Sequence, residues 1–162
     1  MKIHLLIVDP QNDFCDPKGA LCVPGADADM QRTADMIRRI GPKLDDIHVT
    51  LDSHQMVQIE RPAWWKHVTT GDMPAPFTVL GLTPDNRIVA VDMSSGSPVL
   101  TNDEYTTFAP SLYDDARAYL KALSDGGRYP HVVWTNHCVV GTWGWGIVPD
   151  LAVNIEDIRY DE

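Results

Sequence analysis

Three short apolar, β-branched runs occur along the chain, and each leads directly into polar residues. The runs are residues 3–8, 47–51 and 132–134, and the polar residues that follow include Asp9, Asp52, His54 and His137. Unbroken apolar runs of this length are typical of strands that are buried on both faces, as in parallel sheets. We therefore predict three such strands.

A helix is predicted between the first two strands, over residues 28–40. Met30, Ala34 and Ile37 fall at helical spacing, and Gly41 followed by a proline ends the segment. A strand, a helix and a second strand over about 50 residues indicate a βαβ unit.

A second helix is predicted over residues 111–123. It opens with Ser111 as a candidate cap and with acidic residues in its first turns, and it ends at Gly126 before the third strand. The predicted fold class is therefore α/β, with a three-layer, open, mainly parallel sheet and helices on both faces.

Residues 61–110 break this alternation, because they are rich in Pro, Gly and Thr. The elements expected there are a hairpin of residues 77–82 and 87–91, joined by a turn at 83–86, and a short strand at 99–100. We interpret the segment as one long β-containing insertion in a single domain that spans residues 1–162.

Composition limits the classes of partner. The chain has 162 residues and a formal net charge of −10, with 44% hydrophobic residues, as in an ordinary globular domain. We expect no nucleic-acid partner, because no basic run is present, and no membrane span, because no apolar stretch approaches about 20 residues. Three cysteines are too few, and odd in number, for a disulfide framework, which favours a cytoplasmic location.

The candidate chemistry lies at the strand ends, where functional groups gather in open parallel sheets. Asp52 and His54 are two residues apart, so both side chains point to the same side of a strand. With His137 they offer one carboxylate and two imidazoles, which suit Zn²⁺, Fe²⁺ or Mn²⁺ with open positions for water or substrate. The alternative is that His54 caps a loop and His137 is a buried, hydrogen-bonded histidine.

The other histidines, His4, His48, His67 and His131, lack this placement and are interpreted as structural. Cys138 is interpreted as a buried structural thiol, because a thiol beside a metal ligand is more often packed than reactive.

Asp9 directly follows an apolar strand, where a carboxylate is unfavourable unless it is solvated, paired or functional. It is either a catalytic group or a loop-bracing one, and Asp13 is better placed to brace the loop. Phe14 and Trp134 either line a pocket for a flat ligand or pack in the core.

Three blocks of sequence together resemble the isochorismatase-like cysteine hydrolases, and within them the nicotinamidases. The blocks are LLIVDPQNDFCDPKGALCVPGAD, LDSH and WTNHCVVGTWGWGIVPDL, and they lie within residues 1–55 and 128–151. The resemblance implies a metal-dependent enzyme that deamidates a small amide, such as nicotinamide, to the acid and ammonia. It implies Asp9 as the acid/base partner of a catalytic Cys, zinc (or iron or manganese) held by Asp52, His54 and His137, and a substrate ring sandwiched by Phe14 and Trp134.

The family's catalytic Lys and nucleophilic Cys lie downstream of the His-Cys block, and this chain has no Lys after Lys121. We therefore expect the N-terminal part of a longer protein; an intact mass of 18.1 kDa for the native protein would count against this. We also expect association with a second copy or with the missing C-terminal part, because strand edges and apolar faces would otherwise be exposed.

Two alternative functions remain open. Two histidines and one carboxylate also form the facial triad of non-haem Fe(II) oxygenases, although these would be expected on an all-β scaffold. The second alternative is a non-catalytic binding module on the same scaffold, which would bind metal and ligand without releasing ammonia.

Overall fold

The computed structural model describes residues 2–160, which form two compact units. The first unit combines Met1–Gln55 with His137–Glu162, and the second is Met56–Asn136. The second unit includes the predicted insertion at 61–110.

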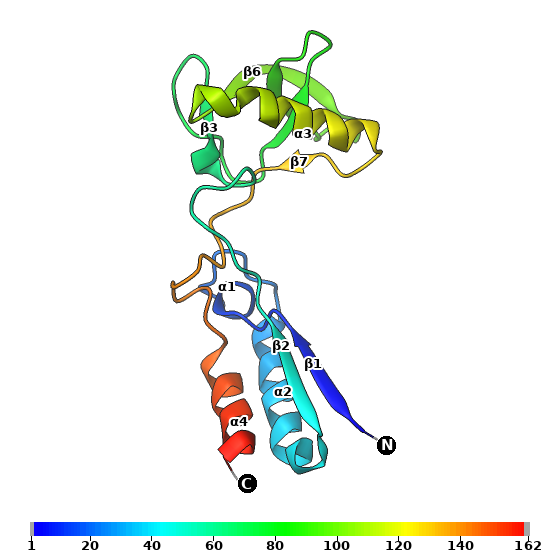
Figure 1. The fold of residues 1–162 in the computed structure, drawn as a ribbon, viewed down its shortest axis with the longest axis vertical. Coiled ribbons are helices and arrows are strands. Elements are labelled where there is room, and N and C mark those ends of the chain that lie inside the picture. Colours follow the sequence, from blue (N-terminus) through cyan, green and yellow to red (C-terminus); the bar gives the residue numbers. More distant parts are fainter. Residues whose placement is uncertain (1, 161–162) are drawn as a thin grey trace. The chain divides into compact units, whose positions relative to one another are not determined.

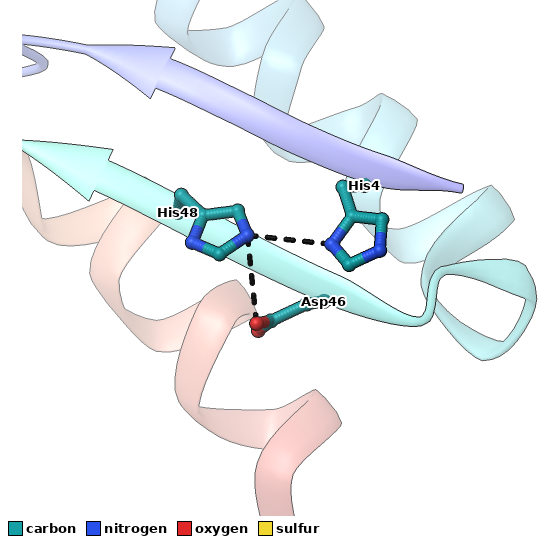
Figure 2. A group of neighbouring side chains, drawn as sticks. All are labelled: His4, Asp46 and His48. Atoms are coloured by element: carbon teal, nitrogen blue, oxygen red, sulfur yellow. Dashed lines mark hydrogen bonds and ion pairs between the residues drawn. The ribbon is translucent and has the colours of Figure 1, made fainter. Parts of the chain in front are cut away.

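The first unit is built on a parallel pair of strands, β1 and β2 (Figure 1). Its elements are β1 (His4–Val8), α1 (Asn12–Cys15), α2 (Ala26–Ile40), β2 (Asp46–Thr50) and α4 (Pro149–Tyr160). The register places His4 beside Asp46 at the start of the pair and Val8 beside Thr50 at its end; the start is drawn in Figure 2. The predicted βαβ unit is thus confirmed.

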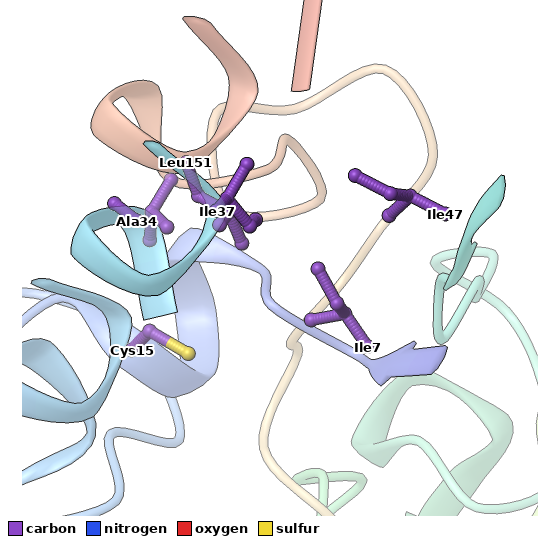
Figure 3. Packing of buried hydrophobic residues seen from close by; sticks show 7 residues of the cluster. Ile7, Cys15, Ala34, Ile37, Ile47 and Leu151 are labelled. Atoms are coloured by element: carbon purple, nitrogen blue, oxygen red, sulfur yellow. The ribbon is translucent and has the colours of Figure 1, made fainter. Parts of the chain in front are cut away.

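The core of the first unit lies between one face of this strand pair and the helices. Ile7 and Ile47 pack in one cluster with Ala34 and Ile37 of α2 and with Leu151 of α4 (Figure 3). The helix forms because its apolar residues repeat at helical spacing and turn toward the strands. Side chains alternate along β1, so its opposite face carries the exposed Leu6 and Val8.

The second unit is an antiparallel sheet with one helix. Its elements are β3 (Trp65–His67), β4 (Val79–Leu82), β5 (Ile88–Asp92), β6 (Val99–Thr107), α3 (Tyr113–Asp125) and β7 (His131–Val132), and the strand order is β3-β6-β5-β4-β7. Its core contains Trp65, Leu80 and Ile88 from the sheet and Leu120 from α3.

The prediction of an α/β chain is confirmed, and so is the β4–β5 hairpin. The turn is closed by the Asn86 N–H, which donates to the Thr83 carbonyl at 2.9 Å, and Asn86 has a φ of 63°. Asparagine tolerates this left-handed conformation, which is why Thr83–Asn86 can turn the chain.

The prediction of one mainly parallel sheet is wrong for residues 2–160. The run expected as a third parallel strand is β7, and it pairs antiparallel with β4 through Val132 beside Val79. A short apolar run requires a partner strand but does not specify which one, so its sheet could not be assigned. The three-layer arrangement stays a prediction.

Two smaller expectations also differ. The strand expected at 99–100 is the nine-residue β6. Ser111 does not cap α3, because Pro110–Leu112 form a 3-10 turn and the N-cap residue is Leu112. In the described part of the chain, no helix is long and apolar enough to cross a bilayer.

Candidate metal centre

Two backbone hydrogen bonds bring the ends of β2 and of the His-Cys segment together within the first unit. The N–H of His54 donates to the Cys138 carbonyl at 2.9 Å, and the N–H of Val140 donates to the His54 carbonyl at 3.0 Å. His54 and Val139 therefore form a parallel bridge, and His137 is held beside the residues that follow β2.

Asp52, His54 and His137 converge as predicted. Nε2 of His54 lies 2.9 Å from the Asp52 carboxylate, and Nε2 of His137 lies 3.3 Å from the same group. The two imidazole rings meet edge-on with centroids 5.0 Å apart. One ligand atom from each residue lies within 4.8 Å of the others.

The donor set fits a divalent metal ion. Two imidazole nitrogens and one carboxylate are ligands of intermediate softness that suit zinc and other first-row transition ions. Two atoms bound at about 2.0–2.1 Å to one tetrahedral ion lie about 3.3 Å apart, and the two imidazole nitrogens lie at similar distances, 2.9 and 3.3 Å, from the Asp52 carboxylate. The side chain of His137 is 7% exposed, whereas those of His54 and Asp52 are 21% and 27% exposed, so solvent partly reaches the group.

Gln11 holds the backbone of Asp52 in place. Its Nε2 donates to the Asp52 carbonyl at 2.8 Å, and its Oε1 accepts from the Asp52 N–H at 2.8 Å. The same Nε2 also donates to the Trp145 carbonyl at 2.9 Å, and the side chain is fully buried. Gln11 is not among the residues predicted from the sequence, although a glutamine just after a buried strand is itself a signal of a polar group that needs partners.

Asp13 braces the loops around the site, as predicted. One carboxylate oxygen accepts the Cys138 N–H at 2.7 Å and the other accepts the Ala20 N–H at 2.9 Å. A Cβ on Gly144 would overlap this carboxylate, so only glycine fits there.

Asp9 and Cys138 both adopt the left-handed conformation, with φ values of 51° and 49°. This conformation is uncommon for residues that carry a Cβ, and such positions are often found at functional sites. Here they mark the end of β1 and the residue after His137. Cys138 is completely buried, in agreement with its interpretation as a packed thiol.

The Asp9 carboxylate is held by the neighbouring strand. Its Oδ1 accepts a hydrogen bond from the Thr50 hydroxyl at 2.7 Å, and the Asp9 N–H donates to the Thr50 carbonyl at 3.2 Å. Asp9 thus follows β1 at the same end of the strand pair at which Asp52 follows β2. Its catalytic role stays a prediction.

The two aromatic residues expected at a pocket lie in different units. The Phe14 ring contacts the His137 ring, with centroids 5.5 Å apart, so Phe14 borders the metal centre. Trp134 belongs to the second unit, where its ring meets Phe77 edge-on at 5.8 Å and is 39% exposed.

The surroundings of Cys15 do not activate it as a nucleophile. Burial raises the pKa of Cys15, and the neighbouring Cys22 and Asp29 raise it further. Because the thiolate is the reactive form, this environment disfavours attack by Cys15. Cys22 is exposed, and all three cysteines are free of disulfides.

No family model and no curated protein matches the chain. Among solved structures it is similar to yeast nicotinamidase, with a TM-score of 0.55 and 21% identity over 98% of this chain and 54% of that one. The same yeast enzyme bound to the inhibitor nicotinaldehyde gives a TM-score of 0.52 with the same identity and coverage. The chain spans about half the length of these structures. At this identity the likeness shows a shared fold, and it supports the resemblance drawn from the sequence at that level.

Proposed function

We propose that this chain carries the metal-binding part of an amide hydrolase that acts on a small, pyridine-like amide such as nicotinamide. The observation that carries the proposal is the convergence of Asp52, His54 and His137 in a chain that shares its fold with a nicotinamidase. Zinc is the proposed ion, with iron and manganese as alternatives that suit the same donors.

The proposed ion would be held by Asp52, His54 and His137, and when bound it would supply positive charge that attracts a ring nitrogen or orders a water molecule. Phe14 would offer an apolar face to a flat ring, because its own ring already lies against His137. Asp9, oriented by the Thr50 hydroxyl, would accept and return a proton.

The proposed reaction needs a thiolate, which the resemblance places downstream of the His-Cys block. Its sulfur attacks the amide carbonyl carbon, the C–N bond breaks as the nitrogen leaves as ammonia, and water then cleaves the thioester to the acid. Cys15 and Cys138 are buried, and the family's catalytic Lys and Cys have no counterpart in this sequence. We therefore expect the 162-residue chain to bind metal and substrate without releasing ammonia.

Oxygenase chemistry is the second candidate, because the same two imidazoles and one carboxylate suit Fe²⁺. The surroundings favour the hydrolase, since Asp52 and His54 follow a parallel strand of a βαβ unit. Oxygen consumption by the Fe²⁺-loaded chain would support the oxygenase, and its absence would support the hydrolase.

We also propose that Trp134 stacks on the substrate ring. A further polypeptide or a second copy of the chain is the proposed partner. The exposed apolar side chains of Leu6 and Val8 on β1 support an association.

The test compares two ligands with the Co²⁺-loaded chain. Nicotinamide should change the visible absorption of the bound Co²⁺, whereas benzamide, which lacks the ring nitrogen, should change it much less. His137→Ala should abolish the response, and His67→Ala, a histidine of the second unit, should keep it. An identical response to both ligands, or a response that persists in His137→Ala, would contradict the proposal.

A further inference from the structure

A second group of metal-ligating side chains lies on the strand pair of the first unit: His4, Asp46 and His48 (Figure 2). Nδ1 of His4 is 3.3 Å from Nε2 of His48, and that nitrogen is 3.5 Å from Oδ2 of Asp46. The two imidazole rings stack with centroids 5.6 Å apart and an interplanar angle of 14°. The group shares no residue with the centre formed by Asp52, His54 and His137.

The strand geometry explains why these side chains meet. Asp46 and His48 are two residues apart on β2, so they project from the same face of the strand. The parallel register places His4 directly beside Asp46, on the adjacent strand. The ligands therefore stand on hydrogen-bonded strands, and such a support fixes their separation better than a loop would.

We infer that His4, Asp46 and His48 form a second binding site for a divalent transition ion, with Zn²⁺ as the reference ion. Two imidazoles and a carboxylate are the donors that such ions select, while Mg²⁺ prefers an all-oxygen set. The spacings of 3.3 and 3.5 Å match the roughly 3.3 Å expected between two ligands of one tetrahedral zinc ion. Three protein ligands leave a fourth position for water.

This site is accessible, and its ligands can be replaced without damage to the core. The side chains of His48 and Asp46 are 54% and 48% exposed, and they lie on the face of the strands away from Ile7 and Ile47. An ion bound here would join β1 to β2 near the start of both strands. Because it would bind the folded state, it would raise the thermal stability of the unit in proportion to the logarithm of the metal concentration.

The experiment measures bound zinc by equilibrium dialysis and elemental analysis, on protein freed of any histidine tag. His54→Ala is the starting variant, because it removes a ligand of the other centre. This variant should still bind one zinc ion, the His54→Ala/His48→Ala double variant should bind none, and His54→Ala/His67→Ala should retain the ion. Mg²⁺ should bind to none of them.

Thermal unfolding supplies an independent readout. Zinc should raise the Tm of His54→Ala and of its His67→Ala control, and it should leave the Tm of the His48→Ala double variant unchanged. If circular dichroism shows that this double variant is misfolded, His4→Ala in its place makes the same test. Absence of zinc from a folded His54→Ala chain, or equal zinc binding with and without His48, would overturn the inference.

The inference is separate from the proposed function. His48→Ala alone should leave the centre of Asp52, His54 and His137 able to bind its ion. Loss of metal binding at one site can therefore be distinguished from loss of metal binding at the other.

Discussion

The side-chain amide of Gln11 pairs with the backbone of Asp52, donating to its carbonyl oxygen and accepting from its N–H, each at 2.8 Å. The residue that follows β1 by three positions thus fixes the conformation of the residue that supplies the carboxylate of the metal centre. These bonds connect Gln11 to the backbone of Asp52 and not to the proposed metal ion or substrate, so Gln11 is a positioning residue.

Replacing Gln11 by alanine should therefore weaken metal binding. The change leaves the backbone groups of Asp52 without their buried partners, which should lower the free energy of unfolding by about 1–3 kcal/mol. By analogy with other groups that orient metal ligands, zinc affinity should fall by roughly 10- to 100-fold. Isothermal titration with Zn²⁺ in the His48→Ala background, which leaves one site, measures the effect.

The matched control for this change is Gln31→Ala, because Gln31 is an exposed glutamine on α2. It should leave zinc affinity unchanged. Equal affinities for Gln11→Ala and Gln31→Ala would show that the contact with Asp52 does not position the carboxylate.

Gly144→Ala should destabilise the first unit, because the added methyl group would overlap the Asp13 carboxylate. That carboxylate holds the N–H groups of Cys138 and Ala20, so its displacement loosens both loops beside the site. The expected loss is about 1–3 kcal/mol, as for other substitutions that overfill a packed region. Chemical denaturation monitored by far-ultraviolet circular dichroism measures it.

Gly146→Ala provides the graded comparison, because its methyl group would meet its nearest neighbour, the Trp143 carbonyl, at 3.3 Å. The loss should be smaller than for Gly144→Ala. The reverse order would contradict the role given to Asp13.

Asp9 and Asp52, which follow β1 and β2, should differ in their effects on metal binding. Asp52→Asn should lower zinc affinity strongly, because it removes a charged ligand that lies beside both imidazoles. Asp9→Asn should leave that affinity within about threefold, because Asp9 is held by Thr50 and is no member of the ligand set. Zinc titrations of both variants in the His48→Ala background decide the point, and a loss of affinity in Asp9→Asn as large as in Asp52→Asn would contradict it.

The second unit should lose stability in mild acid because of His131. Burial lowers the pKa of His131 below its ordinary value of 6.5, against the opposing effects of its hydrogen bond to the Ile59 carbonyl and of Glu60. Between the lowered pKa of the folded state and 6.5, the unfolded chain binds more protons than the folded one. The contribution of His131 to the free energy of unfolding is therefore fully present above pH 6.5, and it is lost as the pH falls through the pKa of His131 in the folded state.

Hydrogen exchange of the β4 and β7 amides measures this loss of stability. After correction for the intrinsic rate, the amides should exchange through faster opening at about pH 5.5 than at about pH 7.5. His131→Gln should remove the pH dependence, whereas His67→Gln should leave it in place. An unchanged pH dependence in His131→Gln would assign the effect to another group.

The sequence predicts local elements well where one physical signal dominates. The helix α2 and strands β1 and β2 follow from the spacing of Ala34 and Ile37 and from apolar runs, and their packing in one cluster confirms that interpretation. The partner of β7 does not follow, because its pairing with β4 depends on residues more than 40 positions away.

The candidate site shows the same division. Asp52, His54 and His137 are predictable because they follow apolar runs at strand ends, and the structure brings their ligand atoms together. Gln11 is not predictable as a brace for Asp52, because its role depends on two backbone hydrogen bonds across the loop. The group of His4, Asp46 and His48 is not predictable for a related reason, because its assembly depends on the register of β1 against β2.

The most direct test of the central claim is anomalous X-ray diffraction from crystals of the zinc-loaded chain, recorded on both sides of the zinc absorption edge. We predict an anomalous peak about 2.0–2.1 Å from Nε2 of His54 and Nε2 of His137 and within bonding distance of an Asp52 oxygen. A map in which zinc occupies other positions while these three side chains remain only hydrogen-bonded to one another would contradict it.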